Sequence, residues 1–233
     1  MSLKGKIIVI EGTDGSGKQT QAKHLKERLE RDGYTVYSTS FPNYPSDSSA
    51  AVRMYLNGQI KKEAKEVSAK AASAFYAVDR YITYKREIEP IHSQAESVIV
   101  FDRWVESNII HQGAKLIADI VDEKERVEML TEFITWLHRL EYFDFEVPRP
   151  DVTIYLNVPI SYTINLRKNR ANKITGGEKQ DIHEADEKHL IDASMSGLLA
   201  AKTLNWEVIE CVKDGEMRTI EDIAEEVWQR VNK

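Results

Sequence analysis

The sequence predicts an α/β fold in which a five-stranded parallel sheet lies between two layers of helices. Five short apolar runs recur along the chain, and the stretches between them are long enough for helices. The runs are continuously apolar rather than alternating, which is typical of strands that are covered on both faces. The predicted strands are 7–10, 35–40, 97–101, 152–157 and 206–210. The predicted helices are 20–31, 49–57, 64–87, 123–141, 160–170, 184–201 and 220–231.

The first apolar run ends in a glycine-rich turn that leads into a helical pattern. Residues 12–20 read Gly-Thr-Asp-Gly-Ser-Gly-Lys-Gln-Thr, and Leu25 and Leu29 continue on a helical spacing. A strand, a glycine-rich turn and a helix opening with Gly-Lys form the context of a P-loop, which binds phosphate through backbone N–H groups and the lysine. An ordinary glycine-rich turn would not need this lysine. The predicted nucleoside triphosphate site is Gly12, Thr13, Asp14, Gly15, Ser16, Gly17, Lys18, Gln19 and Thr20.

The position after Lys18 departs from the usual P-loop pattern. The serine or threonine that would contact Mg²⁺ is replaced by Gln19, and Thr20 comes next. The amide oxygen of glutamine reaches a metal only with a different length and angle. We therefore expect Thr20, or a water bound to the metal, to take this role, because Mg²⁺ keeps several waters in phosphate sites.

The second predicted strand, 35–40, leads into a loop around Pro42, and the helix predicted at 64–87 follows further on. That helix carries Tyr76 and Arg80 four residues apart, so the two side chains share a face. An aromatic ring beside a guanidinium suits a ligand with a flat base at one end and a phosphate at the other. In an arbitrary helix, a core aromatic beside a surface arginine is the commoner reading of such a pair.

The third predicted strand, 97–101, is followed directly by Asp102, Arg103 and Trp104. Ligands bind at the carboxyl ends of the strands in open α/β sheets, so this pair is expected beside the P-loop. Asp102 can order Mg²⁺ waters or accept a proton there, while Arg103 can hold a phosphoryl group through two hydrogen bonds. A surface ion pair is the alternative reading of an isolated Asp-Arg pair.

The helix predicted at 123–141 has two apolar stripes. One stripe is Val127, Leu130, Ile134 and Leu137, and the other is Met129, Phe133, Trp136 and Leu140. Such a wide apolar surface needs burial on more than one side. Packing between the sheet and another helix of the same chain accounts for it, and so does a homodimer interface.

The most polar segment, 167–187, lies between two predicted helices and is rich in Lys, Asn, Gly, Glu and Asp. A solvated loop and a mobile lid are both compatible with this composition, and the neighbouring P-loop favours the lid.

Length and composition limit the classes of protein to which the chain can belong. Its 233 residues suit a single domain spanning 1–233 with the lid at about 167–187. The net charge of −6 argues against a nucleic acid polymer as partner but not against a nucleotide. The single Cys211 excludes an intramolecular disulfide and fits a reducing compartment. The first apolar run is too short for a signal or a membrane segment, so we expect a cytoplasmic protein with no membrane partner.

Taken together, these motifs resemble the thymidylate (dTMP) kinase family of P-loop nucleoside monophosphate kinases over essentially the whole chain. The motifs that match in order are the glycine-rich loop, the Pro42 loop, Tyr76 with Arg80, Asp102-Arg103-Trp104, Asn108 with His111 and Gln112, Pro150-Asp151 and the polar segment. The resemblance implies a P-loop NTPase three-layer sandwich. It also implies transfer of the γ-phosphate of ATP to dTMP with Mg²⁺, giving ADP and dTDP, and a homodimer.

The resemblance further implies roles for individual residues. Lys18 would neutralise the charge that migrates between the phosphates, and Asp102 would lie near the metal. Asp14 would approach the 3′-hydroxyl of the acceptor sugar, and Arg103 would hold the acceptor phosphate. The residues expected around the base are Tyr76, which would stack on thymine, Arg80, which would reach the base or its phosphate, and Asn108 and Gln112, which would bond to the pyrimidine edge.

Two departures from the family pattern concern cations. The P-loop has no arginine after Asp14, so a lid cation is expected instead, with Arg170 or Lys173 favoured over Arg167 and Lys179. The Pro42 loop lacks the arginine that clamps the acceptor phosphate in many members. The substitutes open to the chain are the hydroxyls of Ser46, Ser48 and Ser49, the N-terminus of the next helix, or Arg53.

Two alternatives to a dTMP kinase remain: a kinase for another (deoxy)nucleotide acceptor, and a non-catalytic P-loop ATP-binding switch. A switch needs no stacked aromatic, no second arginine pair and no cationic lid. Because the sequence predicts all three, we favour the kinase.

Overall fold

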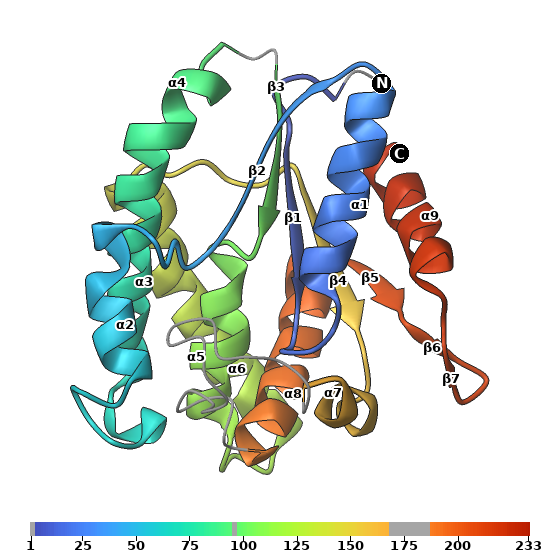
Figure 1. The fold of residues 1–233 in the computed structure, drawn as a ribbon. Coiled ribbons are helices and arrows are strands. Elements are labelled where there is room, and N and C mark those ends of the chain that lie inside the picture. The colour runs from blue at the N-terminus through green and yellow to red at the C-terminus, as the bar shows by residue number, and fades with distance from the viewer. Residues whose placement is uncertain (1–2, 95–96, 168–186) are drawn as a thin grey trace.

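A computed structural model describes residues 3–94, 97–167 and 187–233, which form a P-loop NTPase three-layer sandwich (Figure 1). Its centre is a parallel sheet with the strand order β2-β3-β1-β4-β5. The strands are β1 Ile7–Gly12, β2 Thr35–Ser40, β3 Ser97–Asp102, β4 Val152–Asn157 and β5 Glu207–Glu210. The five predicted strands are therefore confirmed, with boundary shifts of no more than two residues. Because β3 and β4 flank β1 on opposite sides, the carboxyl end of β1 lies at the point where the strand order reverses.

The two faces of the sheet are covered by different helices (Figure 1). Ile8 and Ile10 of β1 pack with α1, Lys18–Arg31, and with α9, Ile220–Val231. The intervening residues of β1 point to the opposite face, as the two-residue period of a strand requires. The helices that contribute to that second face are α3 Ala69–Thr83, α5 Glu106–Ile117, α6 Glu123–His138 and α8 Glu187–Leu204.

The helix predicted at 64–87 is divided into shorter elements. A 3₁₀ turn, Ala64–Glu66, comes first, and α3 begins only after Ser68, whose hydroxyl accepts a hydrogen bond from the backbone N–H of Ala71. Such an N-cap fixes the start of a helix. Beyond α3 the chain continues through a π-helical turn, Tyr84–Ile88, into α4 Glu89–His92. The remaining helical elements are the 3₁₀ turn Asp47–Ser49, α2 Ala50–Leu56, α7 Ile160–Arg167 and the π-helical turn Arg139–Asp144, which is the segment after α6.

Sequence analysis missed α5 and a small hairpin of β6, Val212–Lys213, and β7, Glu216–Met217. Helix α5 had a usable signal, because its buried apolar residues Ile109, Ile110, Ala114 and Ile117 recur at a helical spacing. The hairpin had a usable signal: Asp214 and Gly215 both have positive φ, and Asp-Gly is a preferred two-residue hairpin turn.

The two apolar stripes of α6 are largely buried within the chain itself. Leu130, Ile134 and Leu137 belong to the core, and Phe133, only 2% exposed, stacks on Trp136 with ring centroids 5.8 Å apart. Packing within the chain therefore accounts for most of this apolar surface. Met129, 37% exposed, is the principal apolar side chain of α6 left at the surface.

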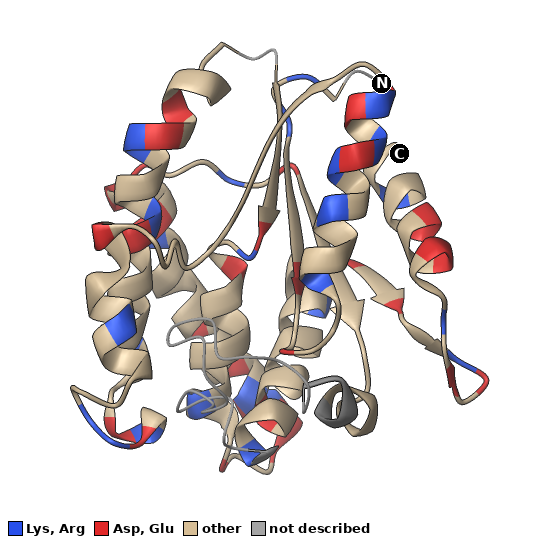
Figure 2. Ribbon diagram, viewed as in Figure 1, with Lys and Arg blue, Asp and Glu red and all other residues tan. Residues whose placement is uncertain are grey.

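Other surfaces are charged. Figure 2 shows acidic and basic residues interspersed along α1, where Lys23 and Lys26 pair with glutamates one turn later. No helix among the residues that the structure describes is long and apolar enough to cross a membrane.

Glycines allow α5 and α8 to approach closely. A Cβ added at Gly113 would lie 2.7 Å from Leu130 and 2.9 Å from Ser196 Oγ. A Cβ at Gly197 would lie 2.5 Å from the hydroxyl of Tyr155 in β4. The Ser196 hydroxyl donates to the carbonyl of Ile109 at 2.7 Å and ties the two helices together. The helix that carries the expected base-binding residues is thus fixed against the sheet.

We expect Gly197→Ala to destabilise the protein by about 1–3 kcal/mol, because the new methyl group overlaps the Tyr155 ring system. An Ala in a helix would otherwise gain about 1 kcal/mol over Gly, so the sign of the change is diagnostic. Urea unfolding measures it, with Lys202→Ala on the exposed side of α8 as the control. A stabilised Gly197→Ala variant would contradict this packing.

Candidate active site

The P-loop connects β1 to α1 and forms a closely packed turn. Gly12, Gly15 and Gly17 have φ values of 149°, 88° and 88°, which residues with a Cβ atom rarely adopt. At Gly12 a Cβ would also lie 2.6 Å from Ser16 Oγ and 2.8 Å from the carbonyl oxygen of Leu156. Only glycine fits there, and the backbone is free to approach a ligand.

Lys18 folds back over this loop. Its Nζ donates to the carbonyl of Thr13 at 2.7 Å, and the residue is only 6% exposed. Burial and, to a smaller extent, the positive charge of Arg103 lower the pKa of Lys18 to about 7, against the opposing effect of nearby carboxylates. The cation therefore lacks a sufficient counter-charge in the free protein. A bound phosphate would supply that charge and favour the protonated ammonium.

The turn after β3 brings Arg103 to the P-loop. Arg103 has a φ of 73°, a conformation that costs a non-glycine residue energy and that clusters at functional sites. Its guanidinium forms an ion pair with Asp14 through Nη2 and bonds to His111 Nε2 through Nη1 at 2.9 Å. Because arginine has only donors, Nε2 of His111 must accept, and burial lowers the pKa of His111 well below its usual value.

Glu11 holds this turn in place from inside the sheet. The residue is fully buried at the end of β1, and its Oε1 accepts a hydrogen bond from the backbone N–H of Trp104 at 2.9 Å. The hydroxyl of Ser107 lies 2.9 and 2.8 Å from its two oxygens. Burial raises the pKa of Glu11, and the charge of Arg103 opposes this. One carboxylate thus links the P-loop strand to the arginine turn.

The residues expected to bind Mg²⁺ are suited to it. Asp102 is 5% exposed, and its Oδ1 meets no hydrogen-bond partner among the residues that the structure describes. Oxygen ligands are those that Mg²⁺ prefers. Thr20 is partly buried, whereas Gln19 points to solvent. Within the described ranges no cluster of three acidic, His or Cys residues could hold a metal alone, so phosphate and water oxygens would complete the shell.

The residues expected around the acceptor base lie on α3 and α5. Tyr76 is partly exposed and meets the ring of Tyr55 edge-on at 6.4 Å. Asn108 and Gln112 are 2% and 1% exposed, and Asn108 Nδ2 donates to the carbonyl of Ser73 at 3.3 Å. Oε1 of Gln112 is buried and meets no donor in the described part of the chain. An unsatisfied amide oxygen of this kind is available to a ligand N–H.

Arg80, which was expected to reach the base or its phosphate, is bonded within the protein in this structure. Its guanidinium is 2% exposed and forms two hydrogen bonds to the buried Glu141, at 2.6 and 2.5 Å, while Nη1 donates to the Trp104 carbonyl at 3.3 Å. All three nitrogens therefore bind protein groups. Arg80 and Tyr76 do lie on one helix, but the arginine supports the Trp104 turn rather than projecting beside the aromatic ring.

The serines proposed as substitutes in the Pro42 loop are also engaged within the protein. The hydroxyl of Ser48 bonds to Asp79 at 2.5 Å, and that of Ser49 donates to the carbonyl of Asn43 at 2.8 Å. Nη1 of Arg53 bonds to the carbonyls of Tyr44 and Ser46 at 2.8 and 2.7 Å. These groups fix the shape of the loop that carries Pro42, and Asp79 anchors it to α3.

Comparison with known proteins places this architecture in a family. The family model described as thymidylate kinase matches residues 10–210. The chain belongs to the thymidylate kinase family. A relative from Pyrobaculum aerophilum, named probable thymidylate kinase, is 30% identical over 182 residues, which cover 75% of this chain and 74% of the relative. The thymidylate kinase of a Bradyrhizobium strain is 28% identical over 185 residues, covering 77% and 72%.

A solved structure agrees in fold. The thymidylate kinase of Candida albicans superposes with a TM-score of 0.69 at 21% identity, over 98% of this chain and 92% of that one. At this identity the likeness concerns the fold alone. It covers the sheet and the helices on both of its faces.

Within this thymidylate kinase fold, sequence analysis missed Glu11, Ser107 and Glu141. A carboxylate inside an otherwise apolar strand was a signal for Glu11, because a buried acid needs partners. Glu141 carried no such signal, since it meets Arg80 from 61 residues away. The predicted lid cations Arg170 and Lys173 lie outside the described residues, as does most of the predicted lid segment.

We expect Gly12→Ala to weaken ATP binding at least about tenfold, because the methyl group would overlap both Ser16 and the Leu156 carbonyl and deform the loop. Gly33→Ala is the matched control: Gly33 also has a positive φ, 90°, but has open space around its Cβ position. That control should lose about 1–2 kcal/mol of stability and bind ATP normally. Calorimetric titration and thermal unfolding of both variants separate crowding from backbone strain. Equal ATP affinities of the Gly12→Ala and Gly33→Ala variants would contradict the assignment of this loop as the ATP site.

Binding of ATP should be coupled to proton uptake by Lys18. The pKa of about 7 in the free protein rises when a phosphate binds, so the bound state holds more protons above that pH. Affinity should therefore fall as the pH rises from about 7 to 9, and calorimetry in buffers of different ionisation enthalpy should detect the proton. Lys18→Met should abolish the uptake. A pH-independent affinity of the unmodified protein would contradict this charge balance.

Proposed function

We propose that this protein is a dTMP kinase that transfers the γ-phosphate of ATP to dTMP, giving ADP and dTDP. Family membership supports the reaction class. The observation that carries the proposal is the ion pair between Asp14 of the P-loop and Arg103 of the turn after β3. It brings a donor-phosphate loop and a guanidinium suited to an acceptor phosphate to the same edge of the sheet. Two phosphorylated substrates can therefore meet there.

In the proposed mechanism the protein positions the two nucleotides and neutralises charge, with no covalent intermediate. The P-loop backbone binds the ATP phosphates, and Lys18 supplies positive charge to the transferring phosphoryl group. Arg103 exchanges its contact with Asp14 for the acceptor phosphate, and Asp14 then accepts a hydrogen bond from the 3′-hydroxyl of the sugar. Mg²⁺, held by Thr20, Asp102 and ATP oxygens, would neutralise charge on the β- and γ-phosphates.

Recognition of the acceptor is proposed to rest on neutral groups. Tyr76 supplies an aromatic face for thymine, and Gln112 supplies the buried oxygen that a ring N–H can satisfy. Asn108 lies one turn before Gln112 on α5, on the same side of the helix. Pro42 belongs to the loop that Asp79 ties to α3, which would place it at the acceptor side.

Three further features complete the proposal. A cation from Arg170 or Lys173 would add positive charge in the transition state, as an arginine finger does. We propose a cytoplasmic location, in keeping with one buried, unpaired cysteine. No nucleic acid polymer or membrane is proposed as a partner.

The acceptor is tested with a panel of all nucleoside monophosphates in a coupled assay of ADP formation. We expect dTMP to be the best acceptor and dUMP to be about tenfold poorer in kcat/KM, because one buried methyl group contributes only about 1–2 kcal/mol. A purine monophosphate that exceeds dTMP would leave only the broader kinase assignment. No transfer to any acceptor, with normal ATP binding, would favour the non-catalytic switch.

Tyr76→Ala should raise the KM for dTMP about tenfold or more and leave the KM for ATP nearly unchanged, because stacking on the base is lost. Tyr81→Ala, on an exposed position of the same helix, is the matched control and should change neither constant. Equal effects of the two substitutions would argue against stacking by Tyr76.

We also propose a homodimer, in which the exposed end of α6 around Met129 contributes apolar surface. Sedimentation velocity at micromolar concentration should then give a species near twice the chain mass of 26.7 kDa. Met129→Glu should shift it towards the monomer without unfolding, whereas a monomer in the unmodified protein rejects the proposal.

A further inference from the structure

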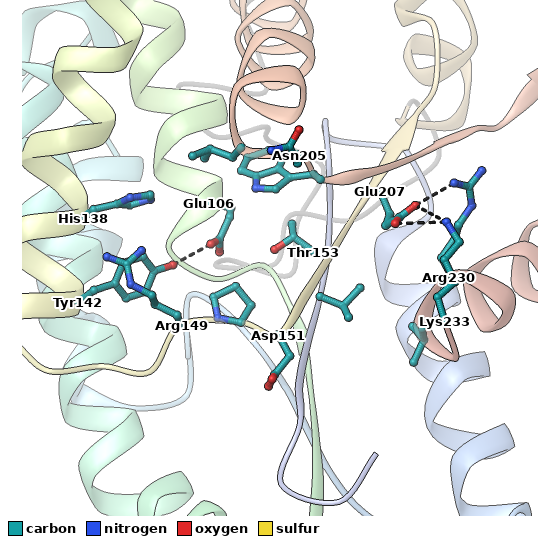
Figure 3. A pocket seen from close by; sticks show the side chains of 15 residues that line it. Glu106, His138, Tyr142, Arg149, Asp151, Thr153, Asn205, Glu207, Arg230 and Lys233 are labelled. Carbon is teal, nitrogen blue, oxygen red and sulfur yellow. Dashed lines mark hydrogen bonds and ion pairs between the residues drawn. The ribbon is translucent and has the colours of Figure 1, made fainter. Parts of the chain in front are cut away.

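A cavity lies away from the P-loop, between α5, the segment after α6 and the beginnings of β4 and β5 (Figure 3). Its volume of about 370 Å³ is within the range of small-molecule sites. The residues that matter here are Glu106, His138, Tyr142, Arg149, Thr153 and Trp206. None of them belongs to the P-loop or to the predicted acceptor site.

The deep end of this cavity contains an unsatisfied carboxylate. Glu106 is 3% exposed, and its Oε1 accepts a hydrogen bond from the Tyr142 hydroxyl at 2.7 Å. Its Oε2 is buried and has no hydrogen-bond partner in the described part of the chain, and the same is true of Nε2 of His138. Figure 3 shows the Glu106 carboxyl and the Thr153 hydroxyl facing the same hollow. Leaving such groups unpaired is costly, so a ligand whose polar edge pairs with them would be bound favourably.

One exposed cation that lines this cavity is Arg149. The guanidinium of Arg149 lies over the Tyr142 ring, 4.3 Å from its centroid, and the residue is exposed. No carboxylate among residues 3–94, 97–167 and 187–233 forms an ion pair with it. Arg230 and Lys233, at the opposite side of the cavity, are instead paired with Glu207 at 2.8 and 3.1 Å. Arg149 is therefore the cation available to an anionic ligand.

Aromatic side chains supply the remaining surface. The rings of Tyr142 and Trp206 line the cavity from two different segments. Because Arg149 lies over the Tyr142 ring, the Trp206 indole is the face to which a flat heterocycle would bind. A ligand that matches the buried polar groups, the aromatic surface and Arg149 is planar, has hydrogen-bonding groups along one edge and carries an anionic group. We propose that this cavity binds a nucleotide, with the base towards Glu106 and His138 and the phosphate at Arg149.

Indole N–H signals in NMR spectra test this proposal site by site, because the chain has only four tryptophans. Trp206→Phe assigns the signal of Trp206. The unmodified protein is then titrated with AMP, GMP, CMP, UMP and dTMP. At least one of these should shift the Trp206 signal in a saturable manner. Arg149→Glu should raise the dissociation constant read from that signal about tenfold or more, because a charge-assisted contact is replaced by repulsion.

Arg139→Glu is the matched control, since Arg139 is an exposed arginine that does not line the cavity, and it should leave the titration unchanged. If no monophosphate moves the Trp206 signal, or if Arg149→Glu and Arg139→Glu titrate alike, the proposal is overturned. Either result is independent of turnover, so it leaves the proposed kinase reaction to its own test.

Discussion

The hydrogen bonds of Glu11 are the constraint on which the rest of the site depends. β1 ends at the P-loop and β3 ends at Asp102, so two phosphate-binding segments leave the sheet side by side. Parallel pairing alone aligns the strands but does not fix the turns beyond them. Glu11 does so by accepting the Trp104 N–H and bonding to Ser107 in the first turn of α5. Because the carboxylate is fully buried, losing either partner would leave it unsatisfied, which makes the turn costly to rearrange.

This constraint also explains the charge balance of the free site. Lys18 is buried and Arg103 is partly buried; the charges of these two cations repel each other, and Asp14, Asp102 and Glu11 surround them. Burial lowers the pKa of Arg103, but the three carboxylates outweigh it and raise that pKa. Arg103 therefore stays charged, and Lys18 is the cation whose protonation would change on phosphate binding. An anion that binds between a permanently charged Arg103 and a Lys18 that can take up a proton is stabilised by both positive charges.

Sequence analysis recovers those parts of the structure that depend on short-range patterns. The strands, the glycine turn and the Asp102-Arg103 pair are each encoded within a few residues, so they could be predicted. The burial of the polar residues Glu106, Asn108 and Gln112 in α5 could not be predicted, because tertiary packing causes it. The environment of Arg80 could not either. Spacing correctly places it on the face of Tyr76, but its partner Glu141 comes from a distant helix, and such a contact has no local signature.

The position of Arg80 changes how acceptor recognition should be understood. A buried Arg–Glu pair contributes little net stability, but removal of one partner leaves an uncompensated charge. The pair therefore acts as a support that ties α3 to the segment after α6 and, through Nη1, to the Trp104 carbonyl. With Arg80 engaged there and no arginine in the Pro42 loop, the proposal assigns the acceptor phosphate to Arg103. In the same proposal, discrimination between bases rests on Tyr76 and the amides of α5, whose buried polar atoms would penalise a base that leaves them unpaired.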